Sequence, residues 1–336
     1  MAITLPIASY WQKILNPDLG RLAEPIHGWF YAIQTNGDLA VSLAALLILG
    51  FCLGLLGGLF GGASGFLMAP LLNLVGNIPY NVAVGTELSM MVGTATIANL
   101  RQRGLGYVDY KLGILLFLGS CIGLEIGAQL LESLTYAGEV TLWSRKISLL
   151  QLVMTMVYGG LLAWIGSQVY REARSVHQAE PSDDGTPGVP SIAMASRLQR
   201  AALPPMVSLP LSGVEAVSLW VILGIGAVTG LLTGLLGVSG SFIRMPALIY
   251  ILGIPTVVSI DTNLFNYLIL ALYGALTHSV KGNVDLLLMV ILLVATIPGS
   301  QCGVLLRKKL SGPRSQLLFA GIICAIIITM LWKVLK

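Results

Sequence analysis

Eight apolar runs, each long enough to cross a lipid bilayer, constrain the fold of this 336-residue chain more than any other feature. They cover about residues 39–60, 82–100, 110–131, 147–169, 216–237, 256–280, 284–306 and 315–335. About 20 apolar residues span a hydrocarbon core of about 30 Å, because a helix rises about 1.5 Å per residue. Hydrophobic residues make up 56% of the chain and charged residues 10%, which excludes an ordinary soluble domain. The sequence therefore predicts an all-α integral membrane protein.

Two further apolar runs, 66–76 and 242–252, are too short to cross the membrane as regular helices. Each run follows a glycine-rich break and precedes an Ile-Pro pair. We therefore expect two short broken or re-entrant helices beside about eight full transmembrane helices.

The second half of the chain repeats the first. Residues 54–88 align with residues 230–264 without a gap, at a constant offset of 176. The pairs matched at this offset include Pro79 and Pro255, Thr86 and Thr262, and the Gly-x-Val-Asp tracts at 106–109 and 282–285. Internal duplication in a multi-span protein is typical of secondary carriers, whose site lies between the repeats near the middle of the bilayer.

These features divide the chain into four parts. Residues 1–37 lack the pattern of a signal peptide and carry aromatic residues suited to the bilayer surface, so we expect an interfacial segment. The first membrane repeat is expected at 38–170 and the second at 214–336. Residues 171–213 are rich in proline, serine and charge, and they predict a polar linker.

Basic residues at the ends of the runs predict which loops are cytoplasmic. The Lys and Arg at 101, 103 and 111, and those of the linker, place both segments inside. The basic cluster at 307–314 favours inverted repeats, whereas Lys333 and Lys336 oppose them. If the short runs dip in and return, the repeats are parallel; if the flanking breaks complete them into crossings, the repeats are inverted. We favour inversion by analogy with carriers.

The glycine-rich breaks at 61–65 and 237–241 predict a binding site. Irregular backbone is tolerated at membrane depth only where protein buries it or where it lines a cavity. Each break opens a short helix, whose free N–H groups favour an oxyanion. We expect a small anion to be bound there by Gly62, Ser64, Gly65, Ser239, Gly240 and Ser241. The alternative is that these small residues only allow close helix packing.

Arg244 lies inside the second short run, where the residue at the repeat offset is Met68. A charge at membrane depth costs about 3 kcal/mol on insertion scales, so it suggests a function. A guanidinium also matches a pair of sulfonate or sulfite oxygens. We expect Arg244 to contact the anion. The alternatives are that it neutralises Asp261 or that it snorkels to the membrane surface.

Two acids, Glu87 and Asp261, are expected deep in the membrane. If helices begin at Pro79 and Pro255, these carboxyl groups lie about 12 and 9 Å along them. An acid at that depth finds a partner or takes up a proton, as a proton-coupled carrier requires. We therefore predict both as proton-coupling groups, with structural hydrogen bonding by the protonated acid as the alternative.

Four polar residues complete the expected anion site as hydroxyl or amide donors: Thr86, Thr262, Asn263 and Asn266. Ordinary interhelical hydrogen bonding is their alternative role. His278 lies close to Lys281, so we expect it at the membrane surface and assign it no role.

Other ligands are not expected. The four cysteines lie in apolar runs without ligand spacing, so we predict neither a metal nor another cofactor. The net charge of +4 comes without a basic arm, which argues against nucleic acid as a partner. The expected partners are a small anion, protons and the lipid bilayer, with a homo-oligomer left open.

At these residues the chain resembles the TauE/SafE family of sulfite and organosulfonate exporters. The likeness covers about residues 40–335 and rests on residues 61–66, Pro70, Pro79, residues 82–86, Gly106, Val108 and Asp109, and on Phe242, Pro246, Ile254, Pro255, Thr262, Val284 and Asp285. It implies a carrier of the bacterial inner membrane, not an enzyme, that moves sulfite or sulfonates such as sulfoacetate outward with proton coupling. Glu87, Arg244 and Asp261 depart from the family's pattern.

Rival functions are a carrier or channel for another small anion, a scaffold that docks a cytosolic protein through the linker, and an intramembrane serine protease. The protease reading rests on residues 62–65 and 237–240, which both fit Gly-x-Ser-Gly. That chemistry requires a histidine within reach of the serine.

Overall fold

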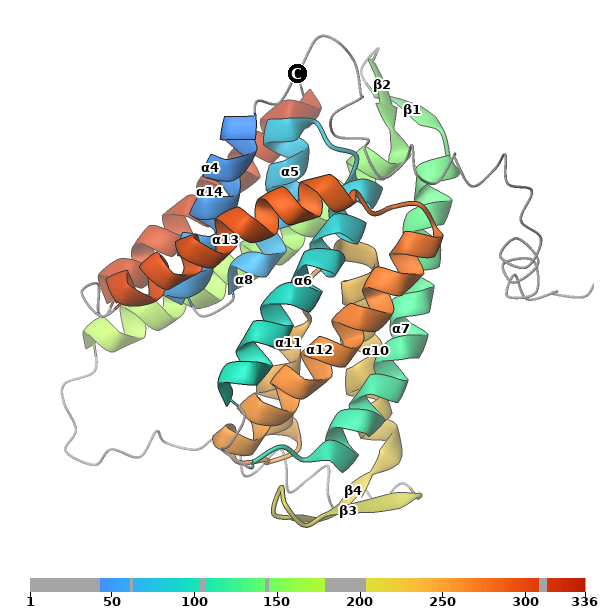
Figure 1. The fold of residues 1–336 in the computed structure, drawn as a ribbon, viewed down its shortest axis with the longest axis vertical. Coiled ribbons are helices and arrows are strands. Elements are labelled where there is room, and N and C mark those ends of the chain that lie inside the picture. Colours follow the sequence, from blue (N-terminus) through green and yellow to red (C-terminus); the bar gives the residue numbers. More distant parts are fainter. Residues whose placement is uncertain are drawn as a thin grey trace, which may run out of the picture.

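The computed structural model describes residues 43–60, 63–102, 107–142, 145–178, 204–307 and 313–335. The expected interfacial segment 1–37, Gly62 and much of the expected linker lie outside these residues. The described chain is mostly helical (Figure 1). The prediction of a helical membrane protein is therefore confirmed in its main feature.

The first half of the chain contains α4 (Leu43–Phe60), η1 (Ala63–Leu67), α5 (Met68–Gly76), α6 (Tyr80–Gln102), α7 (Tyr110–Tyr136) and α8 (Leu149–Gln178). The second half contains α10 (Leu219–Leu236), α11 (Ser241–Pro246), η2 (Ala247–Ile251), α12 (Thr256–Val280), α13 (Leu286–Arg307) and α14 (Pro313–Leu335). Within the described residues, six helices are long and apolar enough to cross a membrane: α7, α8, α10, α12, α13 and α14. The predicted span at 82–100 falls in α6, which is outside this class because of polar residues such as Asn81, Glu87 and Asn99.

Two antiparallel hairpins were not predicted. Strands β1 (Glu139–Leu142) and β2 (Arg145–Ser148) precede α8, with Glu139 paired to Ser148. Strands β3 (Met206–Leu209) and β4 (Val214–Ser218) precede α10, and their register shifts between Val207 and Leu209. The expectation of a purely helical chain is therefore wrong outside the helical bundle. Alternating apolar and polar residues in these short segments favour strands over helices.

The expected helix starts at the two prolines are confirmed. The carbonyl of Pro79 accepts the N–H of Ala83 at 2.9 Å, and the carbonyl of Pro255 accepts that of Ser259 at 2.9 Å. Proline suits the start of a helix, because the N–H it lacks would have no helical partner there. The depth expected for Glu87 along α6 and for Asp261 along α12 follows from these starts.

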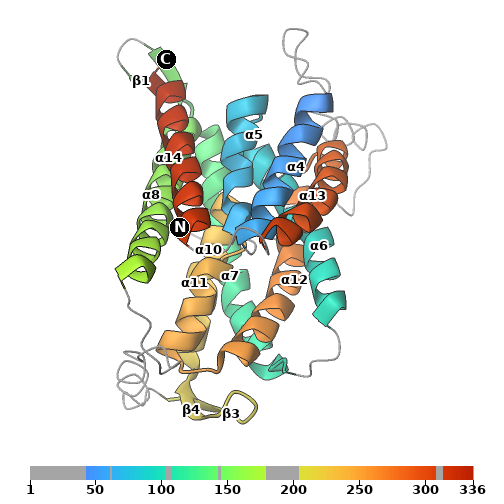
Figure 2. The same cartoon turned by 90° about the vertical axis from the view of Figure 1, so that its left-hand side faces the viewer.

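The two short segments reverse direction within the molecule. In Figures 1 and 2, α4 runs from the upper end towards the middle, and α5 returns to that end. α10 runs from the lower end towards the middle, and α11 and η2 return to the lower end. The two breaks therefore lie in the interior of the molecule, between helices that enter from opposite ends.

Glycines allow two very close helix contacts, and each contact joins the two halves of the chain. A Cβ on Gly123 of α7 would lie 1.9 Å from the carbonyl oxygen of Ala227 in α10. A Cβ on Gly299 of α13 would lie 2.3 Å from the carbonyl oxygen of Phe51 in α4. Such distances exclude any side chain, so helix backbones can touch only where glycine stands. The two contacts correspond, because the repeat offset relates Gly123 to Gly299 and Phe51 to Ala227.

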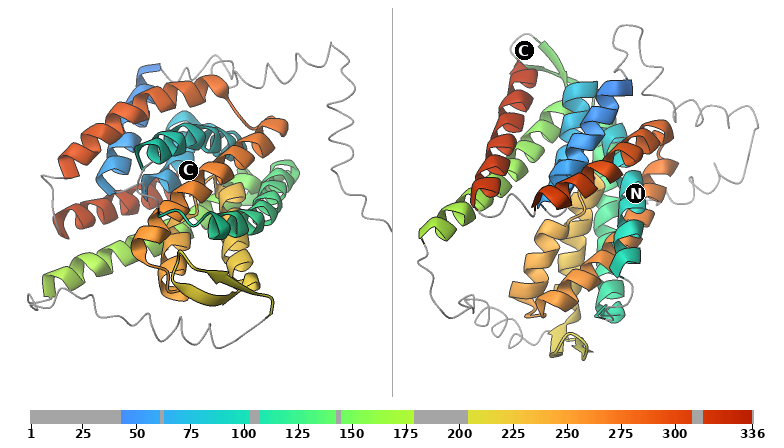
Figure 3. Two further views of the ribbon diagram at one scale, coloured as in Figure 1. Left: turned by 60° about the horizontal axis from the view of Figure 1, so that its bottom comes forward. Right: turned by 60° about the vertical axis from the view of Figure 1, so that its left-hand side comes forward.

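The remaining helices build the centre and one flank. α6 and α12 lie side by side at the centre, and α8 packs against α14 on the flank that Figure 3 shows. At the upper end, Lys333 of α14 donates to the backbone and side-chain oxygens of Asn73 in α5. Asn73 also exchanges hydrogen bonds with Gln151 of α8, at 3.0 and 3.2 Å. A cation there is favoured by the free carbonyls at the C-terminal end of α5.

Candidate functional site

The two breaks meet at Glu87 of α6. A Cβ on Gly65 would lie 3.9 Å from Oε1 of Glu87, and one on Gly237 would lie 3.3 Å from Oε2. The rings of Phe66 and Phe242 are 6.3 Å apart, which links the segments that follow the breaks. Residues expected from the sequence to share a site are therefore brought together from both halves of the chain. Gly62 lies outside the described residues, as does the side chain of Ser64.

The second break is held open by two glycines in the left-handed region, Gly237 at φ 72° and Gly240 at φ 65°. Residues with a side chain rarely adopt this conformation, so glycine serves the backbone here. The carbonyl of Gly240 accepts the N–H groups of Ile243 and Arg244 at 3.1 and 2.9 Å and starts α11. The hydroxyl of Ser239 accepts the N–H of Ser241 at 3.4 Å. Both serines are half-buried beside the break.

Arg244 is the largest fully buried side chain, with 0% exposure. Its Nη1 donates to Oδ1 of Asn263 at 3.3 Å, and its Nη2 donates to Oγ1 of Thr229 at 3.3 Å. Nε has no hydrogen-bond partner among the described residues. Snorkelling to the membrane surface is therefore excluded as the role of this residue.

Arg244 also lacks an acidic partner. Across the described part of the chain, Lys281 and Glu132 form the one ion pair, at 2.5 Å. Asp261 is buried on α12, but the expected alternative of an Arg244–Asp261 pair is not observed. A buried charge without a counter-ion is strongly unfavourable unless a bound ligand neutralises it. Among the described residues, the guanidinium therefore has only neutral hydrogen-bond partners.

Thr229 was missed by the sequence reading. Its hydroxyl donates to the backbone of its own helix, at 2.9 Å to Ile225 and 3.0 Å to Gly226, and its lone pair accepts Arg244. A Cβ on Gly240 would lie 2.9 Å from the Thr229 Cβ, so α10 packs tightly under the break. The signal in the sequence was weak, because a threonine in an apolar run most often bonds only to its own helix.

Glu87 is almost fully buried, with 1% exposure. Its carboxyl group lies against the N–H of Ala69 at the start of α5. Within the described segments, neither oxygen makes a hydrogen bond of normal geometry. Burial disfavours the carboxylate, whereas the free N–H groups at a helix start favour it. Burial therefore favours the protonated form of Glu87, and the start of α5 favours the ionised form.

Thr86 and Thr262 each contact the backbone of the other half of the chain. The Thr86 hydroxyl accepts the N–H of Asp285 at 3.1 Å, and the Thr262 hydroxyl accepts the N–H of Asp109 at 3.0 Å. Each aspartate caps the helix that follows it, since Asp109 accepts the N–H of Leu112 at 3.0 Å and Asp285 accepts that of Leu288 at 2.9 Å. The two threonines therefore anchor turns of the other half, and their role as anion donors stays a prediction, because a hydroxyl that accepts an N–H can still donate its own hydrogen.

The two asparagines separate into different roles. Asn263 faces Arg244, as described above. Asn266 is fully buried and donates from Nδ2 to the carbonyl of Gly113 in α7 at 3.0 Å. Asn266 thus makes the interhelical hydrogen bond that was its alternative role, while its Oδ1 has no partner among the described residues.

His278 was expected at the membrane surface; it lies in the last turn of α12, with its side chain buried inside the protein. The side chain has 0% exposure, and Nε2 lies 3.2 Å from the carbonyl oxygen of Gly234 in α10. A carbonyl oxygen only accepts, so Nε2 carries the hydrogen and Nδ1 is the unprotonated nitrogen of the neutral ring. Nδ1 has no hydrogen-bond partner in the described part of the chain. No group of three His, Cys, Asp or Glu residues that could hold a metal occurs among the residues searched.

Comparisons with known proteins show the family of the chain. The model of the sulfite exporter TauE/SafE family matches residues 46–330. The probable membrane transporter protein YunE of Bacillus subtilis is 24% identical over 277 residues, which cover 80% of this chain and 90% of that protein. A probable membrane transporter protein of Xylella fastidiosa strain 9a5c is 24% identical over 303 residues, with 89% and 97% covered. No solved structure matches the chain. The resemblance found in the motifs is confirmed, and the chain belongs to the sulfite exporter TauE/SafE family of membrane transporters.

Proposed function

We propose that this protein is a proton-coupled secondary carrier of small anions in the bacterial inner membrane. Its expected substrates are sulfite and small organosulfonates such as sulfoacetate, moved outward. The anion binds at Arg244 between the two breaks, and Glu87 carries the coupled proton. The protein acts as a transporter and not as an enzyme.

The observation that carries this proposal is the buried guanidinium of Arg244, which meets two neutral side-chain oxygens and, among the described residues, no carboxylate. Nε has no acceptor within the described residues, and Asn263 and Thr229 orient the two terminal nitrogens. A guanidinium offers several N–H donors in one plane, which suits an oxyanion with two or three oxygens. Sulfite and sulfonates have that shape and charge.

The acid and the cation occupy positions that differ between the two halves. At the repeat offset, Met68 is the counterpart of Arg244, and Glu87 is the counterpart of Asn263. One half thus supplies the cation and the other half supplies the acid, while the shared fold demands neither. This division supports a site that exchanges an anion against a proton.

We propose further that the two halves are inverted repeats. α4 and α10 enter from opposite ends, and the glycine contacts and threonine–aspartate contacts recur at the repeat offset. In carriers of this kind, one repeat rocks against the other and exposes a central site to each side in turn. Asp261, which stands where Gly85 does in the first half, is a second candidate for proton binding.

The protease reading gains no support. A serine nucleophile requires a base within hydrogen-bond reach. Ser239 bonds to the backbone of Ser241, and the described contacts of His278 go to Gly234. A carrier therefore remains the better reading.

The test is transport by the purified protein in liposomes. Vesicles loaded with sulfite or sulfoacetate should release it faster when a proton gradient is imposed, and a pH-sensitive dye should report a matching proton flux. Empty liposomes and vesicles loaded with chloride provide controls. Anion flux that does not change with the proton gradient would favour a channel, and the absence of any anion flux would contradict the proposal.

A further inference from the structure

The interior of the bundle holds a second unpaired titratable group, the imidazole of His278 on α12. The ring is fully buried, and its Nε2–H is held by the carbonyl of Gly234 at 3.2 Å. Nδ1 is left without a hydrogen-bond partner among the described residues. A buried nitrogen with a free lone pair is costly, so such a group needs an explanation.

His278 and Glu87 contact the same turn of α10. His278 bonds to the carbonyl of Gly234, and a Cβ on Gly237, three residues further, would lie 3.3 Å from Oε2 of Glu87. Three residues of a helix correspond to a rise of about 4.5 Å. The two groups with unpaired polar atoms thus flank one short stretch of backbone that leads into the second break.

The other titratable groups near His278 already have partners. On α12, Lys281 pairs with Glu132 of α7 at 2.5 Å, and Tyr273 donates to Glu125 of α7 at 3.2 Å. On α8, the Tyr158 hydroxyl donates to the carbonyl of Leu236. α10 itself carries no titratable residue. Glu87 of α6 is therefore the one acid facing this turn of α10 that lacks a partner within the described residues.

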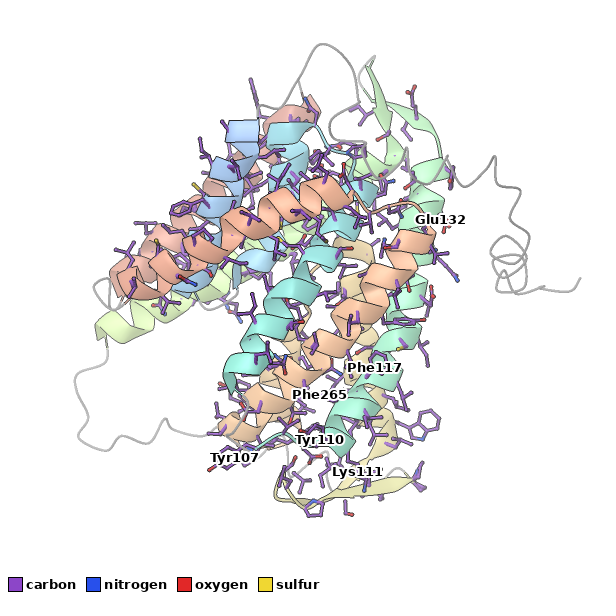
Figure 4. The ribbon with its side chains drawn as sticks, in the orientation of Figure 1. Tyr107, Tyr110, Lys111, Phe117, Glu132 and Phe265 are labelled. Carbon is purple, nitrogen blue, oxygen red and sulfur yellow. The ribbon has the colours of Figure 1, made fainter. Side chains whose placement is uncertain are left out.

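The position of His278 along the bundle gives this arrangement a direction. Figure 4 shows Glu132 at the upper end of α7, far from Lys111 at its lower end. His278 lies one turn before Lys281, the partner of Glu132, so it is close to the upper end of the bundle. Asn283 closes this end, because its N–H donates to the carbonyl of His278 at 2.9 Å.

We propose that His278 is the proton-transfer partner of Glu87 and serves the upper side of the membrane. Nδ1 of the neutral ring accepts the proton that leaves the Glu87 carboxyl group, which becomes a carboxylate while the ring becomes an imidazolium. Nε2–H stays on Gly234 throughout. The imidazolium then releases the Nδ1 proton to water at the upper end, and the ring returns to its starting form. This inference rests on the proposed role of Glu87 in proton coupling.

The test compares His278→Gln with Glu87→Gln in liposomes. Glutamine keeps an amide donor for Gly234 but cannot carry a proton, and glutamine already occupies the position related to His278 by the repeat offset, as Gln102. We expect anion-driven proton flux to fall roughly a hundredfold in His278→Gln. Exchange of labelled anion for unlabelled anion, which needs no net proton movement, should change less than about threefold, since the contacts of Arg244 are intact.

A matched control is Tyr273→Phe, which removes a hydroxyl from the same helix but on the side bonded to Glu125. It should leave proton flux unchanged. His278→Asn serves as a second variant should the glutamine variant fail to fold, because asparagine also cannot carry a proton. Thermal unfolding and gel filtration show which variant is folded.

The outcomes separate the inference from the proposed function. Normal proton flux in a folded His278 variant, with flux lost in Glu87→Gln, would overturn the role of His278 alone. Normal proton flux in Glu87→Gln as well would overturn the proposed coupling. Loss of anion exchange together with proton flux in His278→Gln would indicate a purely structural role and would also contradict the inference.

Discussion

Arg244 donates to the side-chain oxygen of Asn263 over 3.3 Å, and no carboxylate of the described segments pairs with it. The residue related to Asn263 by the repeat offset is Glu87, so an acid occurs at this position in the other half of the chain. The amide holds the guanidinium in place without neutralising it. A substrate anion therefore does not have to displace a protein carboxylate from Arg244.

This relationship predicts the effect of Asn263→Asp. The new carboxylate supplies the counter-ion that Arg244 lacks, and it competes with any bound anion. We expect sulfite or sulfonate affinity to fall by about tenfold or more, equivalent to about 1.4 kcal/mol, while thermal stability is kept or raised. Calorimetric titration and thermal unfolding of the purified variant measure the two quantities. Asn263→Ala, which removes a hydrogen bond but adds no charge, should lower affinity much less; equal losses in the two variants would contradict the explanation.

The glycine contacts between the halves predict a second result. A Cβ on Gly230 of α10 would lie 2.1 Å from the carbonyl oxygen of Ser120 in α7, so Gly230→Ala forces the two backbones apart. Overpacking of this kind costs about 1–3 kcal/mol. The melting temperature in detergent should therefore fall by several degrees. Gly224→Ala on the same helix is the control, because a Cβ there meets nothing within 4 Å. A similar melting temperature in both variants would show that the close contact is not formed.

The crossed threonine contacts predict a third result. Thr262→Val removes the acceptor of the Asp109 N–H, and Thr86→Val removes that of the Asp285 N–H. Each leaves a buried donor unsatisfied, at a cost of about 1–3 kcal/mol. Amide hydrogen exchange should speed up at the turn of the opposite half in each variant. Thr329→Val is the control, since the Thr329 hydroxyl bonds only to its own helix. Faster exchange at the turn next to the mutated helix alone would contradict the crossed arrangement.

Much of the helical layout could be predicted from the sequence. The length and apolar content of a segment are enough to predict a membrane-spanning helix, and proline marks the starts of α6 and α12. The glycine-rich breaks and the repeat offset pointed to Glu87 and Arg244 as exceptional residues before any contact was known. The arrangement of the halves as repeats stays a prediction, supported by contacts that recur at the same offset.

Other features depend on contacts that a sequence does not reveal. The Thr262 hydroxyl accepts the N–H of Asp109, which lies far away along the chain and could not be guessed from spacing. The burial of the His278 side chain was not foreseen from its position near Lys281, because it depends on α10 packing against this part of α12. Lys333 likewise makes a contact that the sequence does not reveal, since its ammonium group binds Asn73 at the end of α5. A charge that serves a contact inside the fold says little about topology.

The central claim is that the buried guanidinium of Arg244 binds the transported anion. Calorimetric titration of sulfite and sulfoacetate into purified Arg244→Gln and Arg244→Lys, at one ionic strength, tests it most directly. We expect Arg244→Gln to lose at least about a hundredfold in affinity, or about 2.7 kcal/mol, and Arg244→Lys to lose less because it keeps the charge. Unchanged affinity in a folded Arg244→Gln protein would contradict the claim.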